Sequence, residues 1–317
     1  MTRRLRREAA RSSRWTPWAL AGLTAAVALA IVLTPGLRDE LDERSHVLTA
    51  KALVNPTFSD VATINDNLAY CGSSDRHQTL DLYLPKVVPS RPVPLVVYIH
   101  GGGWRAGDKV NGLVRFYGPE LVQRGYALAA IDYRLAPGSV FPAQNEDVSC
   151  ALGYLQHNAA RYGLDSGHIT LFGDSAGGQL VAYAALSERY RSQPWRAAIR
   201  GVVDFYGVSD FRPLVSAIKP DHSARFYLGS NYLNLAAEAS PVTGRPVAPP
   251  PFLIVYGVHD GVVPPAQSLL LAQHLRDSGG RVEVIRVDKA GHGFSARTAP
   301  TASDIRERVN GFVLSVE

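Results

Sequence analysis

Short apolar runs recur along the chain and alternate with longer amphipathic stretches. Most of these runs are almost continuously apolar and are bounded by glycine, proline or charged residues. Such runs are typical of strands that are covered on both faces of a sheet. They occupy residues 95–99, 126–133, 168–172, 202–206, 252–257 and 282–287.

Helical patterns lie between the apolar runs, at residues 113–124, 146–160, 179–186, 267–277 and 302–316. The regular alternation of strand and helix predicts an α/β fold with a mostly parallel central sheet and helices on both faces. Residues 79–84 instead alternate between apolar and polar positions and end at Pro85. This pattern predicts an antiparallel strand near the sheet edge. Residues 61–70 fit neither pattern clearly.

One interval, residues 209–251, interrupts the alternation. It contains several prolines and scattered aromatic residues, among them Phe211, Phe226 and Tyr227. A connection this long between two strands of one sheet is typical of a lid or specificity insertion. The alternative is a surface excursion with no role in binding.

The positive charge of the chain is concentrated at its N-terminus. Arginines outnumber acidic residues there, and the residues before position 16 sum to the same +5 as the whole chain. The rest of the chain is therefore close to neutral, which disfavours nucleic-acid binding. The charges concerned are Arg3, Arg4, Arg6, Arg7, Arg11 and Arg14 against Glu8.

The basic leader is followed by an apolar run at residues 18–33 and by an acidic stretch. This order predicts an uncleaved signal anchor, with the N-terminus inside the cell and the body outside. A cleaved signal peptide and a secreted body are the alternative. We therefore expect a leader and anchor at residues 1–36, a linker or amphipathic segment at 37–66, and a catalytic domain at 67–317. Export would permit a disulfide, but the sequence leaves open whether Cys71 and Cys150 pair.

A Gly-x-Ser-x-Gly motif is centred on Ser175, between a predicted strand and a predicted helix. This context is required for a nucleophile elbow, in which a sharp turn lifts the serine hydroxyl clear of the sheet. A serine hydroxyl needs a base to accept its proton, and the base needs a partner to orient it. Asp260 and His292 each follow a predicted buried strand. Because the carboxyl ends of parallel strands share one edge, we expect Ser175, Asp260 and His292 to meet there.

A negatively charged oxygen that forms during acyl transfer requires preorganised hydrogen-bond donors. The sequence His100-Gly101-Gly102-Gly103 directly follows a predicted buried strand and offers amides without side chains. The amide of Ala176, after Ser175, is a further candidate donor. No spacing of histidine, cysteine or carboxylate residues suggests a metal site, and none of this chemistry needs a cofactor.

Four ordered motifs resemble those of the hormone-sensitive-lipase-like bacterial carboxylesterases of the α/β-hydrolase fold. They are His100 to Trp104, Asp132 to Pro137, Phe141 to Ala143 with Asp147, and Gly173 to Gly178. Residues 80–85 also resemble the related arylesterases and feruloyl-esterase-like proteins. The resemblance spans about residues 67–315 and implies an oxyanion hole formed by Gly102, Gly103 and Ala176. The family often has a glutamate soon after the second motif, where this chain has Gly138 after Pro137.

These observations favour a membrane-anchored serine carboxylesterase that hydrolyses short-chain acyl or aryl esters through an acyl-enzyme intermediate. An exported aminopeptidase or amidase on the same fold is an alternative, and so is a hydrolase homologue that only binds a ligand. The expected partners are a small-molecule ester and, through the N-terminal segment, a membrane. Acyl-chain length, the alcohol moiety and the oligomeric state cannot be read from the sequence.

Overall fold

The computed structural model describes residues 57–316 except 88–89, 111, 217–221, 245 and 295–297. The chain divides into two units, Met1–Asn55 and Pro56–Glu317, and every described residue belongs to the second. The predicted leader and anchor, and most of the predicted linker, lie outside the described residues. Among the described residues, no helix combines the length and the apolar character that a membrane crossing requires.

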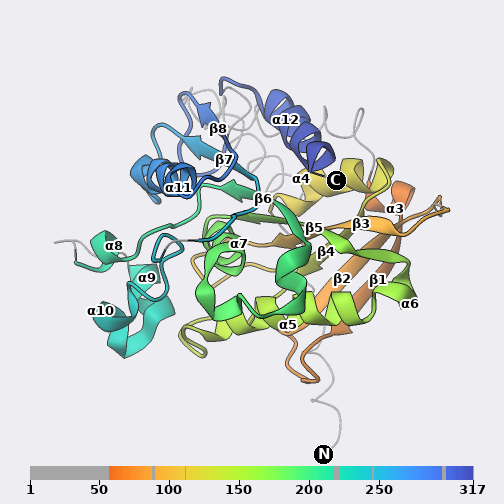
Figure 1. The fold of residues 1–317 in the computed structure, drawn as a ribbon, viewed down its shortest axis with the longest axis horizontal. Coiled ribbons are helices and arrows are strands. Elements are labelled where there is room, and N and C mark those ends of the chain that lie inside the picture. Colours follow the sequence, from red (N-terminus) through yellow and green to blue (C-terminus); the bar gives the residue numbers. More distant parts are fainter. Residues whose placement is uncertain are drawn as a thin grey trace, which may run out of the picture. The chain divides into compact units, whose positions relative to one another are not determined.

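An eight-stranded sheet forms the centre of the second unit, in the order β1-β2-β4-β3-β5-β6-β7-β8 (Figure 1). Strand β2 is antiparallel to both of its neighbours, and the other strand pairs are parallel. The mostly parallel sheet predicted from the sequence is therefore confirmed. The strands are β1 (Ala62–Ala69), β2 (Thr79–Pro85), β3 (Val93–Ile99), β4 (Ala127–Ile131), β5 (Leu164–Asp174), β6 (Ile199–Phe205), β7 (Phe252–Gly257) and β8 (Val282–Val287).

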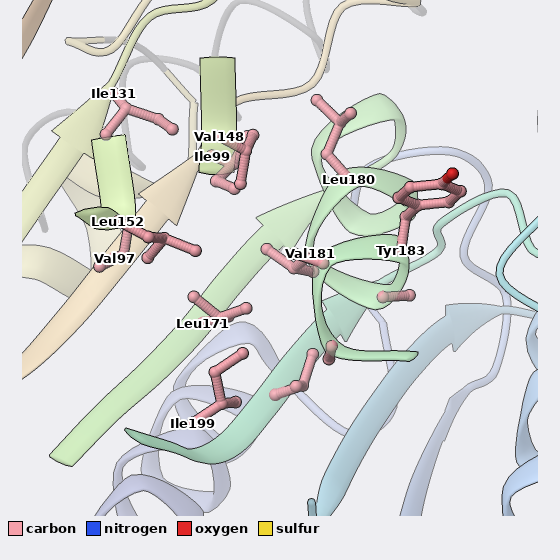
Figure 2. Close-up of a cluster of buried hydrophobic side chains, with 14 of the residues drawn as sticks. Val97, Ile99, Ile131, Val148, Leu152, Leu171, Leu180, Val181, Tyr183 and Ile199 are labelled. Carbon is pink, nitrogen blue, oxygen red and sulfur yellow. The ribbon is translucent and has the colours of Figure 1, made fainter. Parts of the chain in front are cut away.

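Helices cover both faces of this sheet. Successive side chains of the buried strands point to opposite faces, so each face carries its own apolar cluster. In β3, Val97 and Ile99 join one apolar cluster, whereas Val96 and Tyr98 join the other. The first cluster includes residues of α5 (Ala143–His157), α7 (Ala176–Leu186) and α11 (Pro265–Asp277). The second includes residues of α4 (Val114–Gln123) and α12 (Ala302–Ser315). Figure 2 shows Leu180, Val181 and Tyr183 of α7 beside strand residues such as Leu171 and Ile199.

The N-terminal edge of the sheet begins earlier in the chain than the predicted domain boundary. Residues 57–66, which we expected to belong to a linker, contain α3 (Phe58–Val61) and the first half of β1. Phe58 stacks on Tyr83 of β2, with ring centroids 4.0 Å apart. Strand β1 is mostly exposed, as edge strands often are, and mixes apolar with polar residues, so its sequence lacks the apolar run that identified the other strands.

The interval 209–251 contains the short helices α8 (Arg212–Ser216), α9 (His222–Leu228), η3 (Gly229–Asn231) and α10 (Tyr232–Leu235). Two of its aromatic residues, Phe211 and Tyr227, are fully buried. Tyr227 stacks on Trp104, in the loop after β3, with ring centroids 4.5 Å apart. The interval therefore packs against the loop that carries the glycine run, and its role as a lid stays a prediction.

Three further short helices lie in the connections from helix to strand. Helix α6 (Ala159–Tyr162) lies between α5 and β5, and η1 (Glu188–Tyr190) and η2 (Pro194–Ala198) lie between α7 and β6. Cys71 and Cys150 form a disulfide with a Cα–Cα distance of 5.6 Å, across 79 positions of sequence. This bond joins the connection between β1 and β2 to helix α5 and answers the question that the sequence left open.

Candidate active site

Ser175 stands at the turn between β5 and α7, as the strand–turn–helix pattern predicted. Its backbone has φ 53° and ψ −114°, a left-handed conformation that is unfavourable for a residue with a side chain. The turn also requires the two motif glycines. A Cβ at Gly173 would collide with the carbonyl oxygen of Gly177, and a Cβ at Gly177 would collide with the carbonyl oxygen of Ile99. The local sequence thus fixes a sharp turn with Ser175 at its tip.

The structure brings Ser175, His292 and Asp260 together in one hydrogen-bonded row. Nε2 of His292 lies 3.0 Å from Oγ of Ser175, and Nδ1 of His292 lies 2.8 Å from Oδ2 of Asp260. Ser175 follows β5, Asp260 follows β7 and His292 follows β8. The three residues meet because these strands are parallel, which places their carboxyl ends at one edge of the sheet.

The carboxylate of Asp260 is fixed and buried. Its Oδ1 accepts backbone hydrogen bonds from Val262 at 2.8 Å and Val263 at 2.9 Å, and its side chain is fully shielded from solvent. Since a carboxylate oxygen accepts, Nδ1 of His292 donates, and the lone pair of Nε2 then faces the Ser175 hydroxyl. The imidazole also packs against the ring of Tyr206, with centroids 4.6 Å apart.

The histidine next to Asp260 does not join this row. The amide of His259 donates to the carbonyl of Ala290 at 2.8 Å, and its side chain is exposed. Two other histidines have separate surroundings: His168 lies 2.7 Å from Asp165, and burial lowers the pKa of His274. Among the described histidines, His292 is the one that contacts Ser175.

The glycine run after β3 has the backbone that a donor loop needs. Gly102 and Gly103 have φ values of +119° and +60°, which residues with side chains rarely adopt. A Cβ at Gly102 would also collide with the carbonyl oxygen of Ala106. The Gly101 amide donates to Oδ1 of Asp174 at 3.2 Å, so Gly102 and Gly103 are the candidate donors of the run. Ala176 is the first residue of α7, where the helix dipole favours negative charge.

The contacts that hold this loop were not predicted from the sequence, although some of their residues lie in its motifs. The Trp104 indole donates to Oε1 of Gln179 at 3.0 Å, and the Trp104 carbonyl accepts from the amide of Ala136 at 2.8 Å. The Tyr98 hydroxyl donates to Oδ1 of Asp174 at 2.7 Å. All of these contacts join positions more than 30 residues apart, so no local pattern could have shown which residues pair.

Two carboxyl groups near the serine turn have raised pKa values: Asp174, which is half-buried, and Asp204, which is buried. Burial raises the pKa of Asp174, against the opposing hydrogen bonds from Tyr98 and Gly101. Burial also raises the pKa of Asp204 from 3.8 to about 7, although its Oδ1 accepts a 2.9 Å hydrogen bond from the Gly207 amide. The nearby negative charge of Asp174 acts in the same direction as burial on Asp204.

We expect Asp204→Asn to stabilise the protein at pH 8 and to lose this advantage toward pH 4. With a folded pKa of about 7 and an ordinary value of 3.8, Asp204 stays protonated in the folded state through the range in which the unfolded state releases its proton. The stability of the wild-type protein therefore falls, relative to that of the Asp204→Asn variant, as the pH rises from about 4 to 7. At about 1.4 kcal/mol per pKa unit, the increase in the free energy of unfolding caused by Asp204→Asn should reach a few kcal/mol at pH 8. Denaturant unfolding of both proteins between pH 4 and 8 measures it, and a pH-independent difference would contradict this.

The surface also carries a groove that is separate from Ser175 and His292. The groove, of about 670 Å³, lies beside the disulfide, and neither Ser175 nor His292 lines it. Its walls include Cys71, Glu146, Cys150, Tyr154, Arg189 and Tyr190. Within the described ranges, no group of three or more histidine, cysteine or carboxylate side chains is placed to hold a metal ion.

The amino-acid sequence is similar to a known protein family and to several esterases. The BD-FAE family model matches residues 80–275. Esterase LipQ of Mycobacterium tuberculosis is 29% identical over 290 residues, which cover 88% of this chain and 68% of LipQ. Esterase LipC of the same organism is 30% identical over 253 residues, which cover 73% of this chain and 61% of LipC. The chain thus spans about two thirds or less of the length of these curated relatives.

Solved structures of esterases are also similar to this chain. An esterase from Pyrobaculum calidifontis is 26% identical and superposes with a TM-score of 0.64, over 87% of this chain and 90% of the esterase. A truncated carbohydrate esterase from gut microbiota is 25% identical, with a TM-score of 0.69, over 82% of this chain and 98% of that protein. The α/β-hydrolase fold expected from the sequence motifs is therefore confirmed.

Proposed function

The chain belongs to the BD-FAE family, and we propose that, like the esterases that it resembles, it is a carboxylic ester hydrolase. In this proposal it acts as a serine esterase with Ser175 as the nucleophile. The observation that carries the proposal is the continuous row from Ser175 through His292 to Asp260, with contacts of 3.0 and 2.8 Å. Hydroxyl, imidazole and carboxylate in this order can activate a serine at neutral pH.

In the proposed reaction, Oγ of Ser175 attacks the ester carbonyl while Nε2 of His292 accepts its proton. The buried Asp260 carboxylate stabilises the imidazolium that forms and keeps the ring oriented. The carbonyl oxygen becomes negative and accepts hydrogen bonds from Gly102, Gly103 and Ala176. His292 then returns the proton to the leaving alcohol, which breaks the ester bond and leaves Ser175 acylated. Water, deprotonated by His292, releases the acid and restores the serine.

The substrate class proposed is short-chain acyl or aryl esters. Among the described residues of the interval 209–251 the helices are short, and α9 is the longest with seven residues. Phe211 and Tyr227 of this interval are buried rather than open to a ligand. Phe226 of α9 remains 38% exposed and lies on the same interval. This arrangement favours a small apolar acyl or aryl group over a long aliphatic chain.

The proposed location is the extracytoplasmic side of a membrane, with the apolar run at residues 18–33 as a single-pass anchor. The arginine-rich leader and the acidic stretch that follows the run support this orientation. The Cys71–Cys150 disulfide also supports it, since disulfides persist in oxidising compartments. Cleavage of the leader, with release of the catalytic unit, is the alternative.

Ester hydrolysis should exceed amide hydrolysis by a wide margin in the purified full-length protein. We expect turnover of p-nitrophenyl acetate and butyrate, and turnover of aminoacyl p-nitroanilides at least about 10²-fold slower, a difference of about 3 kcal/mol in activation free energy. Parallel initial-rate measurements with both substrate classes test this. Faster anilide cleavage would favour the aminopeptidase alternative, and no turnover of either class would favour a binding protein.

A further inference from the structure

Lys109 is a buried lysine in the connection between β3 and α4, six positions after Gly103. Its ammonium donates three hydrogen bonds of 3.0 Å, to Oδ1 of Asn67, Oγ1 of Thr79 and Oδ2 of Asp132. The carboxylate of Asp81 lies 3.6 Å away. Burying an ammonium without partners is costly, and these contacts compensate for its desolvation.

Asp132 connects Lys109 to the start of the glycine loop. One carboxylate oxygen of Asp132 accepts from the Lys109 ammonium, and the other accepts from the Lys109 amide at 2.7 Å. That second oxygen also lies 3.8 Å from Nε2 of His100, the first residue of the loop. His100 stacks on Tyr133, and its carbonyl accepts from the Tyr133 hydroxyl at 2.9 Å. Both ends of the loop from His100 to Lys109 are therefore fixed to the segment that follows β4.

The loop between these ends folds closely on itself. A Cβ at Gly107 would lie 2.5 Å from the Gly101 carbonyl oxygen and 2.5 Å from Nδ1 of His100. The Gly102 carbonyl accepts from the amides of Arg105 and Ala106, each at 3.1 Å. Because the loop leaves so little free space, we expect a shift at the Lys109 end to displace the backbone near Gly102 and Gly103.

The network also reaches the edge strand of the sheet. Asn67 lies at the irregular register of β1 with φ 51°, and its amide donates to Oδ1 of Asp81 at 2.8 Å. Asn67 and Thr79 both precede residues 80–275, the range that the family model matches. The anchoring of the loop thus depends partly on residues outside the matched region.

We propose that Lys109 is a positioning residue for the oxyanion hole, which it holds in place by joining Asp132 to Asn67 and Thr79. This inference rests on the proposed function, since it gives Gly102 and Gly103 the role of donors. Oxyanion donors contribute only if they are preorganised at hydrogen-bond distance from the developing charge. Loss of the Lys109 contacts should therefore lower the rate of the chemical step more than it affects the binding of the uncharged ester.

The test compares Lys109→Met with Lys86→Met in the full-length protein. Lys86 is a matched control because its ammonium also donates a hydrogen bond to the N-terminal part of the described chain, to the Ser59 carbonyl of α3 at 2.6 Å. Unlike that of Lys109, this contact is exposed. Rates on p-nitrophenyl butyrate are divided by the number of active sites that a fluorophosphonate titrates. For Lys109→Met we expect kcat per site to fall about 10- to 100-fold, as a misplacement of about 1 Å would cause, with KM within about threefold. Lys86→Met should keep the wild-type kcat.

A second readout separates positioning from general destabilisation. A trifluoromethyl ketone forms a tetrahedral adduct with the serine and places a negative oxygen in the hole, so its inhibition constant should rise in Lys109→Met by about the factor lost in kcat. If that variant does not fold, Thr79→Val keeps the ammonium, removes one of its three acceptors and should show the same two changes at a few-fold size. Unchanged kcat per site and an unchanged inhibition constant in a folded variant would overturn the inference, while wild-type ester turnover would still support the proposed function.

Discussion

Replacing His292 by alanine is expected to lower kcat/KM for p-nitrophenyl butyrate by at least about 10⁴-fold, because Ser175 then has no base at 3.0 Å to accept its proton. The imidazole is partly exposed, with 23% of its side-chain surface accessible, so the substitution should leave the fold intact. Initial rates together with circular dichroism of the variant check both statements.

His259→Ala is the matched control for this substitution. His259 has the same chemistry, lies next to Asp260 in sequence and is exposed, but its structural contact is a backbone hydrogen bond to Ala290 that alanine retains. We expect its kcat/KM to stay within about threefold of the wild type. If His259→Ala lost activity as severely as His292→Ala, the assignment of the base would be wrong.

Ser175→Ala should abolish ester turnover to the limit of detection, again at least about 10⁴-fold below the wild type. The covalent route is closed without the hydroxyl, and only binding and the donor loop remain to accelerate attack by water. Ser166→Ala is a suitable control, since Ser166 lies on the same strand, β5, and is exposed near its other end. Full turnover in Ser175→Ala would remove the serine-esterase mechanism altogether.

The sheet and its helices could be predicted because burial on both faces imposes a recognisable pattern. Strands such as β3 and β7 are continuously apolar for this reason, and parallel pairing then determines which loops share an edge. That geometry explains why Ser175, Asp260 and His292 could be expected at one place although they are far apart in sequence. Strand β1 lacked the signal because only one of its residues is buried.

The supporting contacts of the site could not be predicted in the same way. The ammonium of Lys109 meets Asn67 and Asp132 from 42 and 23 positions away, and in sequence alone it is simply one lysine in a polar loop. The two cysteines were visible, but their pairing depends on how the β1–β2 connection reaches α5. Such contacts follow from the tertiary fold and carry no periodic signal.

The most direct test of the account is to map the adduct that a fluorophosphonate forms with the full-length protein. Mass spectrometry of the intact protein and of its peptides should show one adduct, on Ser175, with labelling strongly slowed in His292→Ala and unchanged in His259→Ala. An adduct on a different residue, or ester turnover that survives complete labelling of Ser175, would contradict the claim that Ser175, His292 and Asp260 form the catalytic centre.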